Sequence, residues 1–92
     1  MSILVTVDTT PNEHALKFTI NQKILDSGYQ TFNSLEDAKD LPVAAKIFQN
    51  DAVASVFVMA QPSSAFITIT KKPEIDWGDL QNKIVEDIKS IL

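Results

Sequence analysis

Few side chains in this 92-residue chain have a type and spacing that could support chemistry. His14 is the only histidine and it follows Glu13, so one interpretation makes it a general base or a metal ligand. Metal centres need several converging ligands, and the chain has no second histidine and no cysteine. We therefore expect His14 to be a solvated turn residue, and we predict no metal site.

Two carboxylates and an indole stand together near the C-terminal end. Asp76 and Asp79 flank Trp77, so they could form a carboxylate pair beside an aromatic ligand platform. An acidic residue followed by another three positions later is also typical of a helix start. Trp77 opens an apolar helical stripe, so we expect the two acids to cap a helix and Trp77 to be buried in the core.

The remaining polar motifs are weaker. Ser63-Ser64 has no base nearby in the sequence, and Lys71-Lys72 could dock a small anion but is more typical of a solvated strand end. No phosphate-binding loop, dinucleotide fingerprint or nucleophile elbow is present. We predict that the chain is not an enzyme.

The charge balance argues against further classes of function, namely nucleic-acid binding and membrane binding. Twelve acidic residues oppose eight lysines, there is no arginine, and the net charge is −4. Nucleic-acid binding requires a basic stripe that displaces counterions from phosphates, and anionic membranes need the same positive charge. No apolar run approaches the roughly 20 residues that span a bilayer, and the N-terminus lacks a signal-peptide pattern. We expect a cytoplasmic, monomeric protein that forms one domain over residues 1–92.

Alternating apolar residues predict four strands, at residues 3–7, 16–20, 53–59 and 66–70. The first two and the last two form hairpins. The segment 53–59 is apolar on both faces, which is typical of a central strand. Residues 24–33 are ambiguous, since Tyr29 to Phe32 could form a short edge strand.

Two helical regions separate and follow these hairpins. Ser34 with Asp37 resembles a capping box, and Pro42 must interrupt or restart the helix that begins there. Apolar residues then recur at helical spacing from Trp77 to the C-terminus, at Trp77, Leu80, Ile84, Ile88 and Ile91.

The resulting order β-β-α-β-β-α predicts an α+β fold, a two-layer sandwich. Its four-stranded, mainly antiparallel sheet would carry two helices on one face. The other face would be partly solvated and would present outward residues such as Lys17, Thr19, Thr68 and Thr70.

One group of motifs resembles a known family. Thr10-Pro11-Asn12, followed after three residues by Leu16-Lys17-Phe18, is similar to the opening Thr-Pro-Asn-Pro-Asn-x-Leu-Lys-Phe of the N-terminal domain of Nfu/NifU-like proteins. Further segments resemble that domain in the same order, namely Pro42-Val43-Ala44 with Ile47-Phe48, Val53-Ala54-Ser55-Val56-Phe57, Phe66-Ile67-Thr68-Ile69-Thr70-Lys71, and Asp76-Trp77 with Leu80. The similarity covers nearly the whole chain.

The chain also departs from the family pattern. Glu13 and His14 replace a proline and an asparagine, and Leu41 stands where a capping serine is usual. The loop Gln61-Pro62-Ser63-Ser64 is longer than in typical members. Larger Nfu proteins continue into a domain whose Cys-x-x-Cys motif holds an iron–sulfur cluster, and this chain ends at Leu92 without one.

The resemblance implies iron–sulfur cluster assembly and, for the family, binding of iron ions. Because this chain has no thiolate, we expect it to bind no cluster alone and to act as a non-catalytic accessory or interaction domain. Its partner would be a scaffold or carrier protein with a Cys-x-x-Cys motif. The alternatives are a small-ligand binding protein that uses the open sheet face, and a structural or regulatory protein.

The partner-binding candidates are Pro11, Asn12 and Lys17, because they match the family pattern without obvious core roles. The opposing interpretation is that Pro11 and Asn12 only shape a turn while Lys17 solubilises the sheet.

Overall fold

The computed structural model describes residues 3–61 and 64–92, which form five strands and three helices. The strands are β1 (Val5–Thr9), β2 (Ala15–Ile20), β3 (Tyr29–Phe32), β4 (Val53–Ala60) and β5 (Ala65–Lys71). The helices are α1 (Leu35–Ala38), α2 (Pro42–Phe48) and α3 (Gly78–Ile91). Of the predicted 61–64 loop, Pro62 and Ser63 lie outside the described residues.

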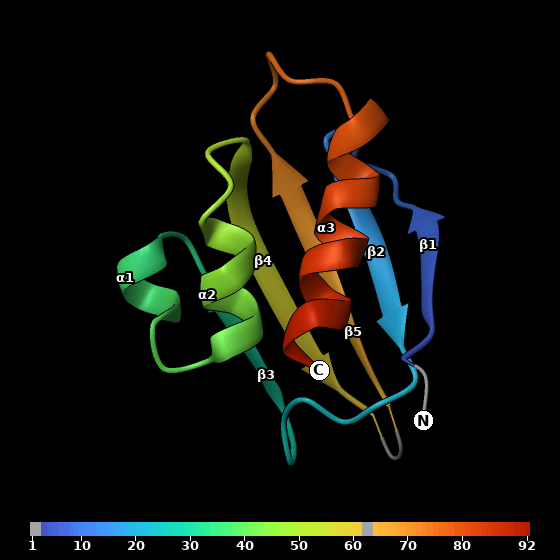
Figure 1. Cartoon of the computed structure of the whole chain (residues 1–92), viewed down its shortest axis with the longest axis vertical. Helices are drawn as coiled ribbons and strands as arrows, with labels where there is room; N and C mark the ends of the chain where they lie inside the picture. Colours follow the sequence, from blue (N-terminus) through green and yellow to red (C-terminus); the bar gives the residue numbers. More distant parts are fainter. Residues whose placement is uncertain (1–2, 62–63) are drawn as a thin grey trace.

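The strands form one antiparallel sheet in the order β1-β2-β5-β4-β3 (Figure 1). Both predicted hairpins are present, and β4 is a central strand as expected. The prediction of four strands is wrong, since Tyr29–Phe32 pairs with β4 as a fifth. Only Phe32 of that strand is buried, so its residues give little hydrophobic alternation from which to infer it.

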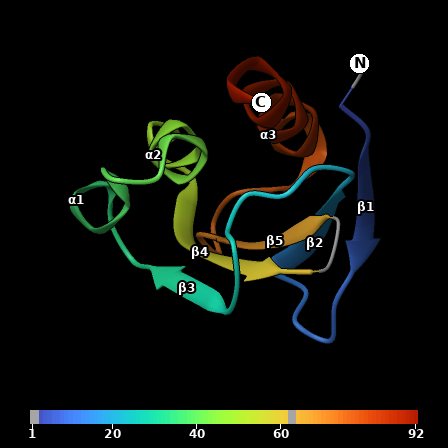
Figure 2. The ribbon, with the colours of Figure 1, turned by 90° about the horizontal axis from the view of Figure 1, so that it is seen from below.

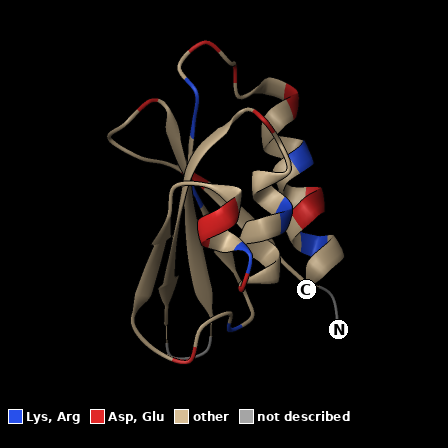
Figure 3. Ribbon diagram, turned by 90° about the vertical axis from the view of Figure 1, so that its left-hand side faces the viewer, with Lys and Arg blue, Asp and Glu red and all other residues tan. Residues whose placement is uncertain are grey.

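The helices all lie on one face of the sheet, which confirms the two-layer α+β class (Figures 2 and 3). The Ser34 hydroxyl accepts a hydrogen bond from the Asp37 amide at 3.1 Å and caps α1, which is a single turn. Pro42 then begins α2, because proline suits the first helical position and cannot continue a helix. The first predicted helical region is therefore two helices. None of the helices in residues 3–61 and 64–92 is long and apolar enough to cross a membrane.

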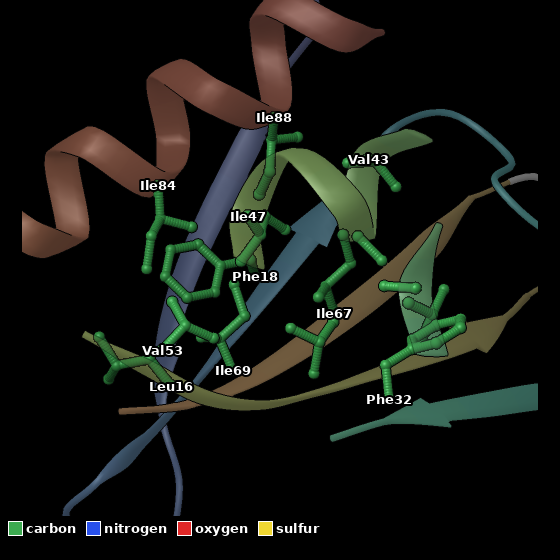
Figure 4. Packing of buried hydrophobic residues seen from close by; sticks show 14 of the residues in the cluster. Leu16, Phe18, Phe32, Val43, Ile47, Val53, Ile67, Ile69, Ile84 and Ile88 are labelled. Atoms are coloured by element: carbon green, nitrogen blue, oxygen red, sulfur yellow. The ribbon is translucent and has the colours of Figure 1, made fainter. Parts of the chain in front are cut away.

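The core lies between the sheet and the helices α2 and α3 (Figure 4). Ile84 and Ile88 point from α3 toward the sheet, where Phe18 and Ile69 are fully buried. Burial of each such side chain typically contributes about 1.5–3 kcal/mol to folding. This set of contacts fixes which face of each strand is covered.

The start of α3 differs from the prediction in two respects. Trp77 itself occupies the N-cap position, with no side-chain cap, so Asp76 does not cap the helix. Trp77 is also half-buried rather than buried, and its ring centroid lies 6.4 Å from that of Phe18. Of the remaining predicted stripe residues, Leu80, Ile84 and Ile88 are buried as expected, whereas Ile91, at the end of α3, is exposed.

Candidate functional site

The face of the sheet opposite the helices carries no covering element among the described residues (Figure 2). Because side chains alternate along a strand, the neighbours of the buried residues point to this side. We call this surface the open face. It consists of Thr6, Asp8, Lys17, Thr19, Tyr29, Thr31, Ser55, Phe57, Met59, Phe66, Thr68 and Thr70. The predicted outward positions of Lys17, Thr19, Thr68 and Thr70 are confirmed.

A row of rings crosses the open face from β3 to β5. The centroids of Tyr29 and Phe57 are 5.6 Å apart, and those of Phe57 and Phe66 are 6.1 Å apart. The ammonium of Lys17, on β2, lies 4.5 Å from the centroid of Phe66. A cation over an aromatic ring at this distance is attracted by the ring quadrupole. Four neighbouring strands thus contribute to one continuous aromatic and cationic surface.

The sequence pattern does not identify these aromatic residues as a surface feature. Phe57 alternates with Val56 and Val58, which are buried under the helices. In sequence, apolar residues on both sides of a strand are typical of burial on both faces. That Phe57 lies on the open face becomes visible only in the structure, where the helices cover the other face alone.

Only two of the twelve open-face residues are charged. Asp8 and Lys17 are register partners on β1 and β2. The other acids and lysines of the described chain lie mainly on the loops and helices (Figure 3). The open face is therefore mostly apolar and hydroxylated, with its charge confined to one side.

The turn before β2 contains the other two candidate residues. The Asn12 side-chain oxygen accepts a hydrogen bond from the backbone N–H of His14 at 2.9 Å. The backbone N–H of Asn12 donates to the Thr10 hydroxyl at 3.1 Å. Pro11 is exposed at this turn. Asn12 therefore shapes the turn, whereas Lys17 lies within β2 on the open face. Whether Pro11, Asn12 and Lys17 bind a partner stays a prediction.

His14 lies in the turn before β2 as expected, but it is half-buried rather than fully solvated. Its Nδ1 atom lies 3.4 Å from the ammonium of Lys71, and its Nε2 atom lies 3.6 Å from the Glu13 carboxylate. The expectation of a solvated strand end is wrong for Lys71, which is buried, whereas Lys72 is exposed as expected. The Lys71 ammonium is also 3.4 Å from the carbonyl of Lys72. These contacts join the turn between β1 and β2 to the end of β5.

A hollow of about 280 Å³ opens at this junction. It is lined by Glu13, His14, Lys71, Pro73, Asp76 and Trp77. Within residues 3–61 and 64–92, no three histidine, aspartate or glutamate side chains converge in a way that could hold a metal ion. The hollow combines a buried ammonium with two carboxylates, so it has no uniform charge.

Comparison with known proteins identifies the family. Residues 5–92 match the sequence model described as "Scaffold protein Nfu/NifU N terminal". The chain belongs to this family. It is 29% identical to NifU-like protein 5, mitochondrial, of Arabidopsis thaliana, over 90% of this chain and 29% of that protein. It is 31% identical to the NFU1 iron-sulfur cluster scaffold homolog, mitochondrial, of Homo sapiens, over 94% of this chain and 33% of that protein.

The chain spans about a third of the length of these curated relatives. A solved structure, protein SAV1430 from Staphylococcus aureus, has a TM-score of 0.69 to this domain at 19% sequence identity. The superposition covers 99% of this chain and 98% of that one. This likeness shows a shared fold.

In this Nfu/NifU N-terminal domain, two of the family-like segments are adjacent strands. Leu16-Lys17-Phe18 on β2 pairs directly with residues 67–69 on β5, with Lys17 opposite Thr68. The contact between Lys17 and Phe66 links the same two segments on the open face. The outward residues Lys17, Phe66 and Thr68 of these two segments therefore meet on the open face.

Proposed function

We propose that this domain is a non-catalytic interaction module in iron–sulfur cluster assembly. The observation that carries the proposal is the family match over residues 5–92 in a chain that contains no cysteine. One relative is named an iron-sulfur cluster scaffold homolog. The partner would be a scaffold or carrier protein that supplies a Cys-x-x-Cys motif.

The cluster would be bound by the partner. Iron–sulfur clusters are held chiefly by cysteine thiolates, with histidine as a less common ligand. The single imidazole here, His14, already contacts Lys71 and Glu13. The domain would therefore act by contact and would influence where the partner's cluster goes.

The open face is the surface that we assign to this contact. Contiguous apolar surface on a folded domain is typical of a protein interaction site. The rings of Tyr29, Phe57 and Phe66 supply such a surface, and Lys17 supplies a charge at its border. The turn that carries Pro11 and Asn12 leads directly into β2, so it extends the same surface.

A chemical-shift titration of the labelled domain with a Cys-x-x-Cys scaffold from the same organism tests the proposal. We expect shifts confined to the open face and the first turn. Changing Asn12 and Lys17 together should weaken binding, whereas Lys23→Ala, at an exposed lysine between β2 and β3, should not. Absence of binding to every cluster-assembly protein tested would contradict the proposal.

The alternative of a small ligand on the open face has less support. Three hollows formed by the described residues, of about 210 to 280 Å³, are lined entirely by residues outside the open face. Ligand pockets usually combine a concave site with converging polar groups. Equilibrium dialysis with small metabolites would test this alternative separately.

A monomeric, cytoplasmic protein is also part of the proposal. The net charge of −4 favours a monomer, because like-charged copies of the chain repel one another. Light scattering of the purified chain and fractionation of the host cell test these two points. The names of the Arabidopsis thaliana and Homo sapiens relatives place those proteins in mitochondria.

A further inference from the structure

The strand β3 forms one edge of the sheet, with β4 as its neighbour in the sheet (Figures 1 and 2). The Gly28 carbonyl accepts a hydrogen bond from the Ala60 amide at 2.9 Å, and this bond sets the pairing. Backbone groups along an antiparallel strand point alternately toward and away from the neighbour. Gln30 and Phe32 therefore face β4, whereas the N–H and C=O groups of Tyr29 and Thr31 point away from the sheet.

Apart from its short length of four residues, this edge lacks the features that usually protect an edge strand. Such features include charged side chains, proline and β-bulges. The residues Tyr29, Gln30, Thr31 and Phe32 include no charge and no proline, and their register with β4 is continuous. The irregularity of the sheet lies elsewhere, between Val53 and Ser55. Three of the four β3 residues are exposed.

The side chains beside this edge include an exposed aromatic ring on the open face. Tyr29 is 65% exposed, and its ring packs at 5.6 Å on Phe57 of β4. A strand added beside β3 would place every second side chain next to Tyr29 and Thr31. Backbone hydrogen bonds would then supply affinity, and the ring of Tyr29 would favour an apolar side chain at the position of the added strand beside it.

The charges at the two ends of β3 are acidic. Asp26 is exposed shortly before the strand, and the α1 region after it carries Glu36, Asp37 and Asp40, all exposed. In the α1 region, Lys39 is paired with Glu36 at 3.1 Å, and before β3 the exposed Lys23 is farther from the strand in sequence than Asp26. An uncharged strand flanked by acidic residues is complementary to an uncharged segment flanked by basic residues.

We propose that the free edge of β3 binds an extended segment of a partner protein by strand addition. The segment has a length similar to that of β3, is uncharged and β-prone, and carries lysine or arginine at its ends. Binding extends the five-stranded sheet by one strand. The inference does not depend on iron–sulfur chemistry, because it concerns backbone pairing and charge alone.

The test uses a synthetic peptide of alternating valine and threonine with two lysines at each end, which contains no cysteine. We expect shifts centred on residues 28–33 and slower hydrogen exchange of the Tyr29 and Thr31 amides. The same peptide with glutamates at its ends should bind about tenfold more weakly, since it meets acidic residues at both ends.

Thr31→Pro removes an outward N–H while leaving the pairing with β4 intact, and proline is tolerated on the solvent side of an edge strand. This variant should lose peptide binding, whereas the matched control Thr31→Val, which keeps the N–H, should retain it. Binding by a folded Thr31→Pro variant, or shifts centred on Phe66 instead of β3, would overturn the proposal. If Thr31→Pro does not fold, amide exchange in the unmodified chain decides: unchanged exchange of Tyr29 and Thr31 at saturating peptide overturns it.

Discussion

The indole N–H of Trp77 donates a hydrogen bond to the backbone carbonyl of Glu13 at 3.3 Å, across 64 positions of sequence. This bond joins the N-terminus of α3 to the turn between β1 and β2. The Trp77 ring also lies against Phe18, at 6.4 Å between centroids. Trp77 therefore holds a helix start and a turn together at the edge of the core.

This position predicts a moderate stability loss for Trp77→Ala. Truncation of a fully buried aromatic residue costs about 3–5 kcal/mol, which is the expected result for Phe18→Ala. Trp77 is half-buried, so we expect about 2 kcal/mol, and no more than about 1 kcal/mol for Trp77→Phe, which removes the hydrogen bond to Glu13. Urea unfolding of the three variants measures these values. Equal losses for Trp77→Ala and Phe18→Ala would show that Trp77 is a full core residue.

The two glycines provide a matched pair that separates backbone strain from side-chain space. Gly28 has a φ of 73°, and a methyl group at either Gly28 or Gly78 would meet no atom within 4 Å. Gly28→Ala should therefore lower stability by about 1–2 kcal/mol through left-handed backbone strain alone. Gly78→Ala should leave stability unchanged or raise it by up to about 1 kcal/mol, because alanine favours a helix. Thermal unfolding of both variants tests this, and a neutral Gly28→Ala would contradict it.

Lys83 predicts a specific pH dependence at high pH. Its ammonium donates a 2.9 Å hydrogen bond to the buried Asp87 carboxylate, and this bond raises the pKa of Lys83 above its ordinary 10.5. A pKa that is higher in the folded state gives stability that is complete below the unfolded pKa and is lost as the pH rises through the folded one. The stability of the unmodified chain should therefore fall above about pH 10.5. This fall should be less steep for Lys83→Met.

The control for this measurement is Lys89→Met. Lys89 is exposed on the same helix and forms no ion pair with the described residues. Urea midpoints between neutral and strongly basic pH should follow the unmodified chain for Lys89→Met. Identical pH profiles for the Lys83 and Lys89 variants would show that the pair with Asp87 contributes nothing.

Asn12 allows the structural role of the turn to be separated from binding. Its side-chain oxygen accepts the His14 amide, so Asn12→Ala should cost about 0.5–1.5 kcal/mol. Asn12→Asp keeps an acceptor at the same position and should restore most of that stability. A stable Asn12→Ala domain would remove the structural role, and any loss of partner binding would then be direct.

Much of the fold could be predicted from local patterns. The alternation in residues 15–20 and 65–71 is read directly from sequence, because each strand buries one face on the helices. Short connections then make the two hairpins antiparallel. The outward position of Lys17 follows from the same alternation.

Features that depend on long-range contacts could not be predicted in this way. The sequence offers the edge strand at Tyr29–Phe32 only as one interpretation, because the strand exists through its pairing with β4 and only Phe32 reaches the core. The burial of Lys71 depends on His14, which is 57 positions away. The partial exposure of Trp77 depends on where the turn between β1 and β2 contacts the start of α3. The apolar periodicity of the helix contains no information about this contact.

Gel filtration after cluster reconstitution tests the central claim most directly. The domain is incubated with iron and sulfide, alone and together with a Cys-x-x-Cys scaffold from the same organism, and the visible absorbance of each peak is recorded. We predict that the domain alone elutes without a cluster. With the scaffold, it should co-elute in a coloured complex that the Lys17 and Asn12 double variant forms less well. A cluster on the domain alone, or a coloured scaffold that elutes without the domain, would contradict the account.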